Sequence, residues 1–420
     1  AAGSLGDNKA LIVDTSVPTI TNVTATTADG SYKQGDQIDI TVTFSENVNV
    51  TGGDPKLTLE NTGGTNPEVE YTSGTGSATL IFEYTIGANQ TAADLDYVAT
   101  TSLVLPTGVF IKDAALNNAT LTLASPGAAG SLGDNKALIV DTSVPDPFNV
   151  GSVITTGGTV VANYWNASNT GIDITVPLDN DASLTGGTLQ IRANVASGGY
   201  EDLGSAHTIL VAEISANKTL SFNAATFEAL SGGLSNLEAL SFTAIITDKA
   251  GNTTTGTQST TTITFDETPP VAFTVGSVIT TGGTVVAGQW TPTNTSIDIT
   301  VPLDNDATLT DGTLQIMASV DGDPYENLGT AHTILVGELN ANKTLSFNAA
   351  PFEALSSGLA HLEVITFTAI ITDKSANATT GTESATTITF DETPPTIAIT
   401  ATNGSTGVTN GDSSSDVALT

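Results

Sequence analysis

The chain has 420 residues, and its 44 acidic residues so outnumber its 10 basic ones that the formal net charge is −34. Charged residues make up only 13% of the chain and hydrophobic residues 39%, which excludes a disordered acidic tail and allows packed cores. The acid excess argues against nucleic acid and anionic membranes as partners, because both carry negative charge. Cysteine is absent, so disulfides cannot hold the fold, and no apolar run approaches the roughly 18 residues of a membrane span.

A short segment, Asp-Thr-Ser-Val-Pro or Asp-Glu-Thr-Pro-Pro, divides the chain at nearly regular intervals. The distance from one leading Asp to the next is 127, then 125, then 125 residues. Each copy follows an alternating apolar stretch, and its prolines exclude both a helix and a central strand, as in a stiff linker between domains. We call these segments the first to fourth joints; they are residues 14–18, 141–145, 266–270 and 391–395.

The joints predict a string of β-domains. Residues 1–18 are identical to residues 128–145, so we expect the chain to begin inside the last strand of an earlier repeat and to be part of something longer. The expected order is a last strand (1–14), a first repeat (15–142), a second repeat (143–267), a third repeat (268–392) and the opening strands of a further domain (393–420).

The first repeat shows the period-two alternation of half-buried strands. This alternation runs through Gln37–Phe44, Lys56–Glu60 and Ala78–Tyr84, and Gly-rich turns separate the segments. Regular strands and turns without intervening helices favour an all-β sandwich over a parallel sheet.

The second and third repeats are near-copies of each other at a fixed offset of 125 residues without gaps. One insertion interrupts the β pattern, and residues 225–237 and their copy from Ala350 are predicted to hold one or two short helical turns. Neighbouring near-identical repeats are typical of an extended, quasi-one-dimensional array in which length is itself the product.

Acidic and amide side chains are expected to converge at the joints. In the second repeat, strands 242–247 and 261–265 are predicted to form a final hairpin, which places the loop Asp248–Asn252 beside the preceding joint. If the sandwich runs up and down, the loop Asp179–Asp181 lies at the same end. The predicted sets are Asp14, Glu46, Asp113 and Asn117 in the first repeat; Asp141, Asp179, Asp181, Asp248 and Asn252 in the second; and Asp266, Glu267, Asp304, Asp306, Asp373 and Asn377 in the third, with Asp391 at the fourth joint.

Gathered carboxylates repel one another unless a cation lies among them, and Ca²⁺ prefers six to eight oxygen ligands. With no cysteine and three histidines, sites for softer metals are disfavoured. We therefore predict calcium at the joints. The alternative is that Asp and Asn occupy these loops simply because they are good turn residues that bond their own backbone.

Catalysis and ligand binding have weaker support. His207 and His332 occupy equivalent strand positions without a nucleophile motif, and His361 is isolated, so we expect no enzyme activity. Trp165 and Trp290 are also equivalent, and they would form a sugar-binding platform if exposed, although a core position is the more usual role for such a large ring.

The first repeat carries a set of short motifs, which are Gly35–Ile38, Val42–Glu46, Asp94–Tyr97, Asp113–Asn117 and Ser131–Ala137 before Val140 and Asp141. These motifs resemble the immunoglobulin-like repeats of very large bacterial surface and secreted adhesins, of the kind often exported by type I secretion. The second and third repeats, with the loop at Asp248 and the Asp-Glu-Thr-Pro-Pro joint, are similar to other bacterial Ig-like repeats. The resemblance extends over essentially the whole chain.

The resemblance implies tandem Ig-like sandwiches in an extracellular adhesin stalk, stiffened by calcium at the joint Asp residues and at the Asp-x-x-x-Asn loops. The chain departs from the pattern at Leu116 and Ala376, which replace the usual loop glycine, and at Glu46 and Asn47, which replace an Asp-Asn-Asp loop. The expected partners are neighbouring repeats. One alternative is a filament or surface-layer subunit, in which strand Leu11–Asp14 is exchanged between identical chains. A second alternative is a carbohydrate-binding module that uses the two tryptophans.

Overall fold

The structure, a computed structural model, describes residues 13–391, 393, 401–403, 406–407 and 417–419. The chain divides into two compact units, and the division cuts through the second repeat rather than falling at a joint. One unit comprises residues 1–154, 171–234 and 239–263, and the other comprises residues 155–170, 235–238 and 264–420. The second joint and the loop Asp248–Asn252 both lie in the first of these units. The third joint and the loop Asp373–Asn377 both lie in the other.

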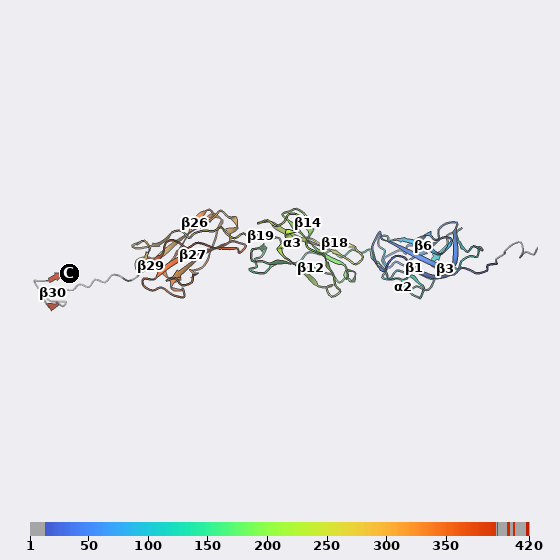
Figure 1. The fold of residues 1–420 in the computed structure, drawn as a ribbon, viewed down its shortest axis with the longest axis horizontal. Coiled ribbons are helices and arrows are strands. Elements are labelled where there is room, and N and C mark those ends of the chain that lie inside the picture. The colour runs from blue at the N-terminus through green and yellow to red at the C-terminus, as the bar shows by residue number, and fades with distance from the viewer. Residues whose placement is uncertain (1–12, 392, 394–400, 404–405, 408–416, 420) are drawn as a thin grey trace, which may run out of the picture. The chain divides into compact units, whose positions relative to one another are not determined.

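The first repeat is a sandwich of short strands around one core. Strand β3 pairs antiparallel with both β1 and β6, so that Val42 is opposite Val23 on one side and Leu80 on the other (Figure 1). All three side chains are fully buried. The elements are β1 (Ile20–Ala25), β2 (Gly30–Tyr32), β3 (Gln37–Thr51), β4 (Lys56–Thr58), β5 (Glu68–Ser73), β6 (Ser77–Thr85), β7 (Leu103–Val104), β8 (Phe110–Lys112), α2 (Leu132–Asn135) and β9 (Leu138–Val140).

The third repeat shows why its sequence forms a sandwich. In β22, Ile297, Ile299 and Val301 are buried while the residues between them are partly exposed, as period-two alternation predicts. This strand belongs to the sheet β20-β22-β26, which faces the sheet β21-β29-β27-β23-β24 across a shared core. The elements are β20 (Val278–Thr281), β21 (Gln289–Trp290), β22 (Ser296–Leu303), η2 (Ala307–Leu309), β23 (Thr313–Val320), β24 (Glu326–Asn327), β25 (His332–Thr333), η3 (Val336–Glu338), β26 (Ala341–Phe347), α4 (Ala349–Glu353), β27 (Val364–Thr372), β28 (Ala378–Thr380) and β29 (Ile388–Phe390).

The second repeat contains the same elements. Its segments in the first unit pair β12 with β16, and β13 with β14, β15 and β17; those in the other unit pair β11 with β19 in parallel. The elements are β10 (Val153–Thr156), β11 (Tyr164–Trp165), β12 (Gly171–Pro177), η1 (Ala182–Leu184), β13 (Thr188–Val195), β14 (Tyr200–Asp202), β15 (His207–Thr208), β16 (Asn217–Phe222), α3 (Ala224–Glu228), β17 (Ala239–Thr247), β18 (Thr253–Thr255) and β19 (Ile263–Phe265).

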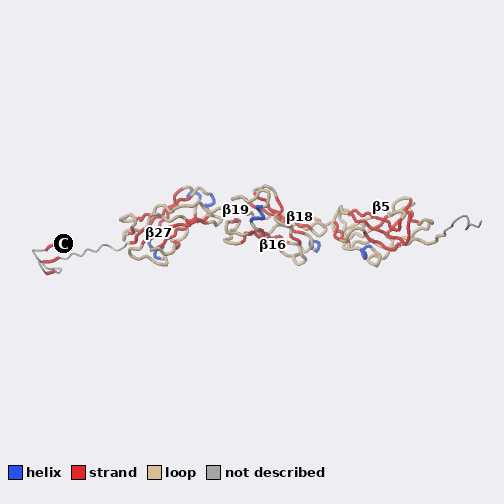
Figure 2. Tube along the Cα trace, in the orientation of Figure 1, coloured by secondary structure: helices blue, strands red, loops and turns tan. Residues whose placement is uncertain are grey.

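The expected all-β class is confirmed, since strands dominate and the helices are single short turns (Figure 2). The predicted helical turns in the insertion are also present as α3 and α4. The side chain of Asn223 caps α3 by accepting the N–H of Thr226, and each helix buries one ring, Phe227 or Phe352. No helix in the described residues is long and apolar enough to cross a membrane.

The predicted final hairpin is wrong in one detail. The loop Asp373–Asn377 joins β27 to the short strand β28, which pairs with it first, and β29 then returns to pair with the opposite end of β27. A Thr-rich segment therefore forms an extra strand that the alternation pattern did not reveal. The turn still places the loop at the end of the domain that the sequence predicted.

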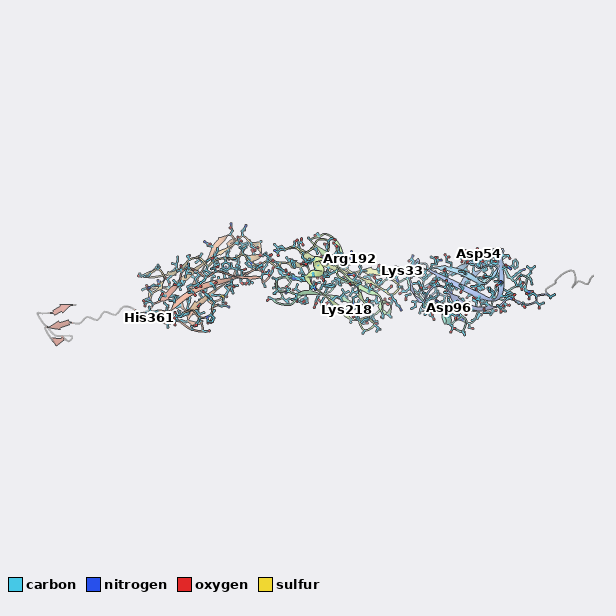
Figure 3. All side chains as sticks on the ribbon, in the orientation of Figure 1. Lys33, Asp54, Asp96, Arg192, Lys218 and His361 are labelled. Atoms are coloured by element: carbon cyan, nitrogen blue, oxygen red, sulfur yellow. The ribbon has the colours of Figure 1, made fainter. Side chains whose placement is uncertain are left out.

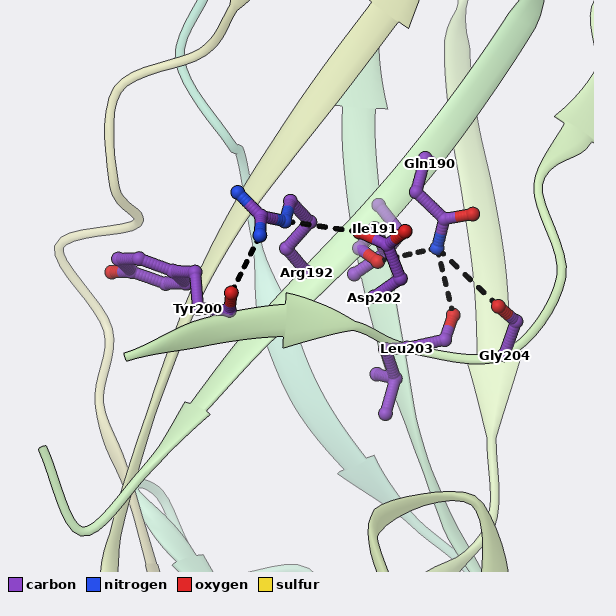
Figure 4. A network of polar contacts seen from close by, with 7 residues as sticks. All are labelled: Gln190, Ile191, Arg192, Tyr200, Asp202, Leu203 and Gly204. Carbon is purple, nitrogen blue, oxygen red and sulfur yellow. Dashed lines mark hydrogen bonds and ion pairs between the residues drawn. The ribbon is translucent and has the colours of Figure 1, made fainter. Parts of the chain in front are cut away.

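An edge hairpin of the second repeat is held by polar side chains. Arg192 on β13 donates from Nε to Asp202 at 3.0 Å and also bonds the carbonyl of Tyr200, while Gln190 donates to the carbonyl of Leu203 at 3.2 Å (Figure 4). The third repeat has Met317 at the position of Arg192, so this ion pair is particular to the second repeat.

Beyond the fourth joint, strands β30 (Ala401–Asn403), β31 (Thr406–Gly407) and β32 (Val417–Leu419) form a small antiparallel sheet. Most of the strand predicted at Leu11–Asp14 lies outside the described residues, as does much of the segment from Thr396 onward.

Candidate functional site

Every joint begins with the same local turn. The leading Asp accepts, through Oδ1, the backbone N–H of the residue two positions on, which orients the linker before its proline. The four bonds are from Ser16 to Asp14 (2.9 Å), Ser143 to Asp141 (2.9 Å), Thr268 to Asp266 (3.3 Å) and Thr393 to Asp391 (3.2 Å). The further partners of the carboxylate differ from joint to joint.

An Asp-x-x-x-Asn loop meets each of the first three joints through its asparagine. In the third joint, one N–H of the Asn377 amide donates to Asp373 Oδ2 at 3.0 Å, and the other donates to the carbonyl of Asp266 at 2.8 Å. The same bridge runs from Asn252 to the carbonyl of Asp141 at 2.9 Å and from Asn117 to that of Asp14 at 3.2 Å. The loops therefore reach the preceding joint, as predicted, but the asparagine acts there as a hydrogen-bond donor.

The loop keeps its shape where the usual glycine is missing. Gly251 has φ +93°, and Leu116 and Ala376 adopt φ values of +75° and +72° in the same left-handed region. Because a side chain makes this conformation unfavourable, both positions carry strain that glycine would not. The loop Asp holds the turn, since Asp373 Oδ1 accepts the N–H groups of Ser375 and Asn377.

The linkers after the second and third joints are fixed along the domains that follow them. After the third joint, Thr379 donates its hydroxyl to the carbonyl of Pro270, the N–H of Thr382 donates to Phe273, and the N–H of Val275 donates back to Thr382. The second joint repeats this arrangement 125 residues earlier, from Thr254 to Pro145 and between Thr257 and Phe148. The linkers are thus bonded at successive points and act as part of the following domain.

The first joint gathers three carboxylates. Oxygens of Asp14, Glu46 and Asp113 all lie within 4.8 Å of one another, the one such group among the described residues. Burial, followed by the charges of Asp14 and Asp113, raises the pKa of Glu46. Burial also opposes the ionisation of Asp113, but hydrogen bonds from the Asn117 side chain and from backbone N–H groups outweigh it and lower its pKa.

These oxygens suit calcium. Ca²⁺ binds oxygen at about 2.3–2.6 Å, so oxygens that share one ion lie within about 5 Å of each other. Glu46, which looked like a weakening departure in the sequence, is the residue that completes the group. The donor set fits a hard divalent cation, and Asp14, Glu46 and Asp113 would hold it.

At the third joint, Asp266 and Asp373 take the places of Asp14 and Asp113. Hydrogen-bond donors surround them instead of a third carboxylate. Asp266 is fully buried and Asp373 is 4% exposed. The hydroxyl of Ser375 donates to Asp266 Oδ2 at 2.7 Å. Burial raises the pKa of Asp373, and the charge of Asp266 adds to the effect, although hydrogen bonds from Asn377 and Ser375 oppose it.

The opposite end of the second repeat contributes to this joint. Asn166 donates to the carbonyl of Ser375 at 2.8 Å, and the N–H of Ala167 donates to Asn377 Oδ1 at 2.9 Å. These bonds fix the orientation of the Asn377 amide, because exchanging its two ends would leave two acceptors facing its oxygen. Both ends of Asn377 are therefore engaged, and calcium coordination by this residue would require them to rearrange.

The second joint is built differently again. Lys33 of the first repeat donates to the carbonyl of Gly251 at 2.9 Å, so a cationic side chain reaches the loop (Figure 3). Asp248 is buried and accepts the N–H groups of Gly251 and Asn252 through one oxygen and the Asn252 amide through the other.

The remaining predicted ligands do not join a three-carboxylate group in the described residues. Asp181 and Asp306 instead cap the short helices η1 and η2, and Asp179 and Asp304 accept the N–H of the residue that follows each. Asp179 and Asp181 line a cavity of about 350 Å³ with the linker Pro145–Asn149, and Glu267 is exposed. The predicted end of the domain is nevertheless correct for this loop, since Lys249 donates its N–H to the carbonyl of Ser183.

At the fourth joint, Asp391 meets a histidine. His361 Nδ1 lies 3.3 Å from Asp391 Oδ1 and 3.1 Å from Thr393 Oγ1. The equivalent position in the second repeat is Asn236, so this partner for the joint Asp is new in the third repeat.

The two strand histidines belong to ion-pair clusters that sequence reasoning missed. Glu213 lies 2.8 Å from His207 on β15 and 2.6 Å from Lys218 on β16, strands that belong to opposite sheets. Burial opposes the ionisation of Glu213, but Lys218, the N–H of Leu210 and His207 outweigh it and lower its pKa to about 2. We call this cluster the inter-sheet clasp; the third repeat repeats it with His332, Glu338 and Lys343.

The alternative of a sugar-binding platform formed by the two tryptophans is wrong. Trp165 and Trp290 are 0% and 1% exposed, and Trp290 packs edge-on against Phe352 and Phe390 in the core. A sugar cannot stack on rings that the sandwich encloses. The residues serve as core anchors, the more usual role for such a large ring.

No protein-family model and no curated protein matches the chain. Among solved structures, the chicken CNTN1 FN1–FN3 domains match 90% of this chain and 99% of their own at 10% identity and a TM-score of 0.31. Domains A168–A170 from titin match 89% and 99% at 10% identity and a TM-score of 0.32.

Proposed function

We propose that this chain is a structural spacer: a run of Ig-like domains from a large extracellular bacterial adhesin, whose stalk projects other domains from the surface. The observation that carries the proposal is the bonded linker. At both the second and third joints an asparagine bridge and successive bonds to the next domain remove the freedom of a segment that would otherwise act as a hinge. Fixed joints that repeat along the chain support a role in holding distance.

Calcium has a narrower part in this proposal than the sequence suggested. The acidic group at Asp14, Glu46 and Asp113 is the best-fitting site, and a cation there would offset carboxylate repulsion. At the second and third joints, several of the oxygen atoms that would coordinate a cation already accept hydrogen bonds. Calcium at Asp141, Asp248, Asp266 and Asp373 remains a prediction.

The acid excess, the absence of cysteine and the resemblance to adhesin repeats support an extracellular location. The same features support the absence of nucleic-acid and membrane partners.

Small-angle X-ray scattering of the full chain tests the spacer function. We expect a long, sharply defined maximum dimension that persists in excess chelator, because the described joints are fixed by hydrogen bonds. Replacing both bridging residues, Asn252→Ala with Asn377→Ala, should broaden the distribution. A broad profile for the unaltered chain with and without calcium would overturn the proposal. A profile that is sharp only in calcium would instead support calcium binding at the second and third joints.

Mass also distinguishes the filament alternative. If identical chains exchange strands, scattering at rising concentration should report a growing particle mass; a constant monomer mass supports the spacer.

A further inference from the structure

The end of the second repeat that receives the third has a distinctive set of contact residues. Asn166 and the N–H of Ala167 bond the loop of the third repeat, as described above. Tyr164 also lies beneath this loop, with Lys374 Nζ 5.9 Å from the centre of its ring, a cation–π contact. We call Tyr164, Asn166 and Ala167 the receiving residues.

All three receiving residues are replaced at the equivalent end of the third repeat. Their counterparts 125 positions later are Gln289, Thr291 and Pro292. Two framework residues are kept: Trp290 is buried like Trp165, and Asn294 closes the same turn as Asn169. Thr293 replaces Ser168 but keeps the hydroxyl, which accepts the N–H of Thr284 as Ser168 accepts that of Thr159. The supporting turn is therefore kept although the contact residues change.

The replacements remove the specific bonds. Proline has no N–H, so Pro292 cannot donate to an incoming asparagine oxygen as Ala167 does. Thr291 has no amide; its hydroxyl contacts Asn294 Oδ1 and the carbonyl of Thr284 within its own repeat. Gln289 offers no aromatic face for a lysine. An incoming asparagine amide would have its oxygen left without a donor, which disfavours the closed joint.

The loop of the third repeat is complementary to the end of the second repeat that carries the receiving residues. Ser375, buried in the third joint, donates its hydroxyl to Asp266, whereas the second repeat has Ala250 at that position and faces the first repeat through Lys33. Each joint therefore has its own pair of complementary surfaces, although the leading Asp and the asparagine bridge are common to all three.

We propose that the receiving residues select the domain that follows: the end of the second repeat accepts a repeat with an Asp-Lys-Ser-Ala-Asn loop, and the end of the third repeat rejects such a repeat. The partner of the third repeat is then a domain of a different type, so the order of domains is encoded in the joint surfaces. This inference rests on the fixed joints of the proposed function and not on calcium.

The test is a lengthened chain in which a second copy of residues 268–392 follows the first. Its new joint brings Gln289, Thr291 and Pro292 against an Asp-Lys-Ser-Ala-Asn loop, while the native third joint serves as an internal standard. Hydrogen–deuterium exchange of the loop peptide 373–380 and its copy measures closure, and the inserted copy carries a mass label at an exposed position within that peptide, Thr380→Ser.

We expect the loop at the native joint to be protected and the loop at the new joint to exchange at least tenfold faster. Introducing Gln289→Tyr, Thr291→Asn and Pro292→Ala in the first copy should restore protection at the new joint. Equal protection at both joints without these changes would overturn the selection. Fast exchange at both joints, the native one included, would instead contradict the fixed joints on which the proposed function rests.

A loss-of-function pair completes the design in the unmodified chain. Asn166→Asp removes the amide donor to the carbonyls of Ser375 and Thr159 but keeps the oxygen that caps Ser168. The carbonyl of Thr159 keeps its bond from Asn169, which supports the turn locally. We expect faster exchange of peptide 373–380 with unchanged protection of β13 and β17. Thr291→Asn is the matched control and should leave that peptide unaffected; an effect as large as that of Asn166→Asp would also overturn the proposal.

Discussion

The first and third repeats use one loop design to make two different joints. In both, an Asp-x-x-x-Asn loop donates from its asparagine to the carbonyl of the preceding joint Asp. In the first repeat, the exposed Asp14 faces Glu46 and Asp113, an arrangement that needs a cation or protons. In the third, the fully buried Asp266 accepts the hydroxyl of Ser375 in place of a third carboxylate. A shared motif therefore does not imply a shared dependence on calcium.

Removal of the asparagine bridge should give the largest difference in stability loss between the first and third repeats. Asn377→Ala leaves the buried carbonyl of Asp266 and the carboxylate of Asp373 short of donors, so the free energy of unfolding of the third repeat should fall by about 3 kcal/mol. Asn117→Ala, at an exposed bridge, should lower that of the first repeat by about 1 kcal/mol. Urea unfolding followed by repeat-resolved hydrogen exchange measures both, and equal losses would contradict the distinction.

Acid should weaken the third repeat through its inter-sheet clasp, which the first repeat lacks. The folded-state pKa of Glu338 is about 2, below its ordinary value of 4.5, so its contribution is complete above that value. It is lost as the pH falls from about 4.5 towards 2. The loss should be about 1–2 kcal/mol after allowance for the remaining exposure of the ion pair.

Glu338→Gln is the control for the clasp. It should flatten the acid limb of the stability curve of the third repeat and leave the second repeat, with its own clasp at Glu213, unchanged. If the stability of the Glu338→Gln variant still falls at acid pH, groups other than Glu338 cause the acid sensitivity.

Calcium should stabilise the first repeat selectively. When free calcium is ten times its dissociation constant, binding to the folded state adds about 1.4 kcal/mol. Glu46→Gln should abolish the gain, because it removes one of the three gathered carboxylates. Isothermal titration calorimetry and thermal unfolding with calcium or chelator provide the measurement. Asp304→Asn is the matched control, and a gain that survives Glu46→Gln would rule out this site.

Mild acid should tighten the third joint. The pKa of Asp373 is raised in the folded state, so the fold favours the protonated form and its stability rises as pH falls through that pKa towards the ordinary value of 3.8. This is opposite in sign to the clasp. Exchange of peptide 373–380, corrected for intrinsic pH dependence, should slow between pH 7 and 4 in the Glu338→Gln background. Faster exchange would contradict the assigned direction.

The smallest expected effect comes from the loop backbone. Ala376→Gly and Leu116→Gly should each stabilise their repeat by about 0.5 kcal/mol, because glycine relieves a left-handed conformation but adds freedom to the unfolded chain. Gly251→Ala should have the reverse effect in the second repeat. Thermal unfolding resolves such differences, and a loss on Ala376→Gly would show that the alanine methyl contributes packing that outweighs the strain.

The sequence alone predicted the β-sandwich class, because alternation such as that of Ile297, Ile299 and Val301 has only one buried solution in a two-layer fold. It also predicted which loop meets which joint, since a strand that ends at one joint must begin at the opposite end of its domain. Regular spacing of Asp14, Asp141, Asp266 and Asp391 identified the repeats themselves.

Only the tertiary structure decided what the converging residues do. Asn377 is a donor because two acceptors and the N–H of Ala167 surround it in space, and residue type cannot separate that role from metal coordination. Asp179 and Asp181 turned out to line a separate cavity beside the linker. The carboxylates of Asp14, Asp266 and Asp391 meet partners from segments about 30 to 110 residues away, and local sequence does not carry the identity of such distant neighbours.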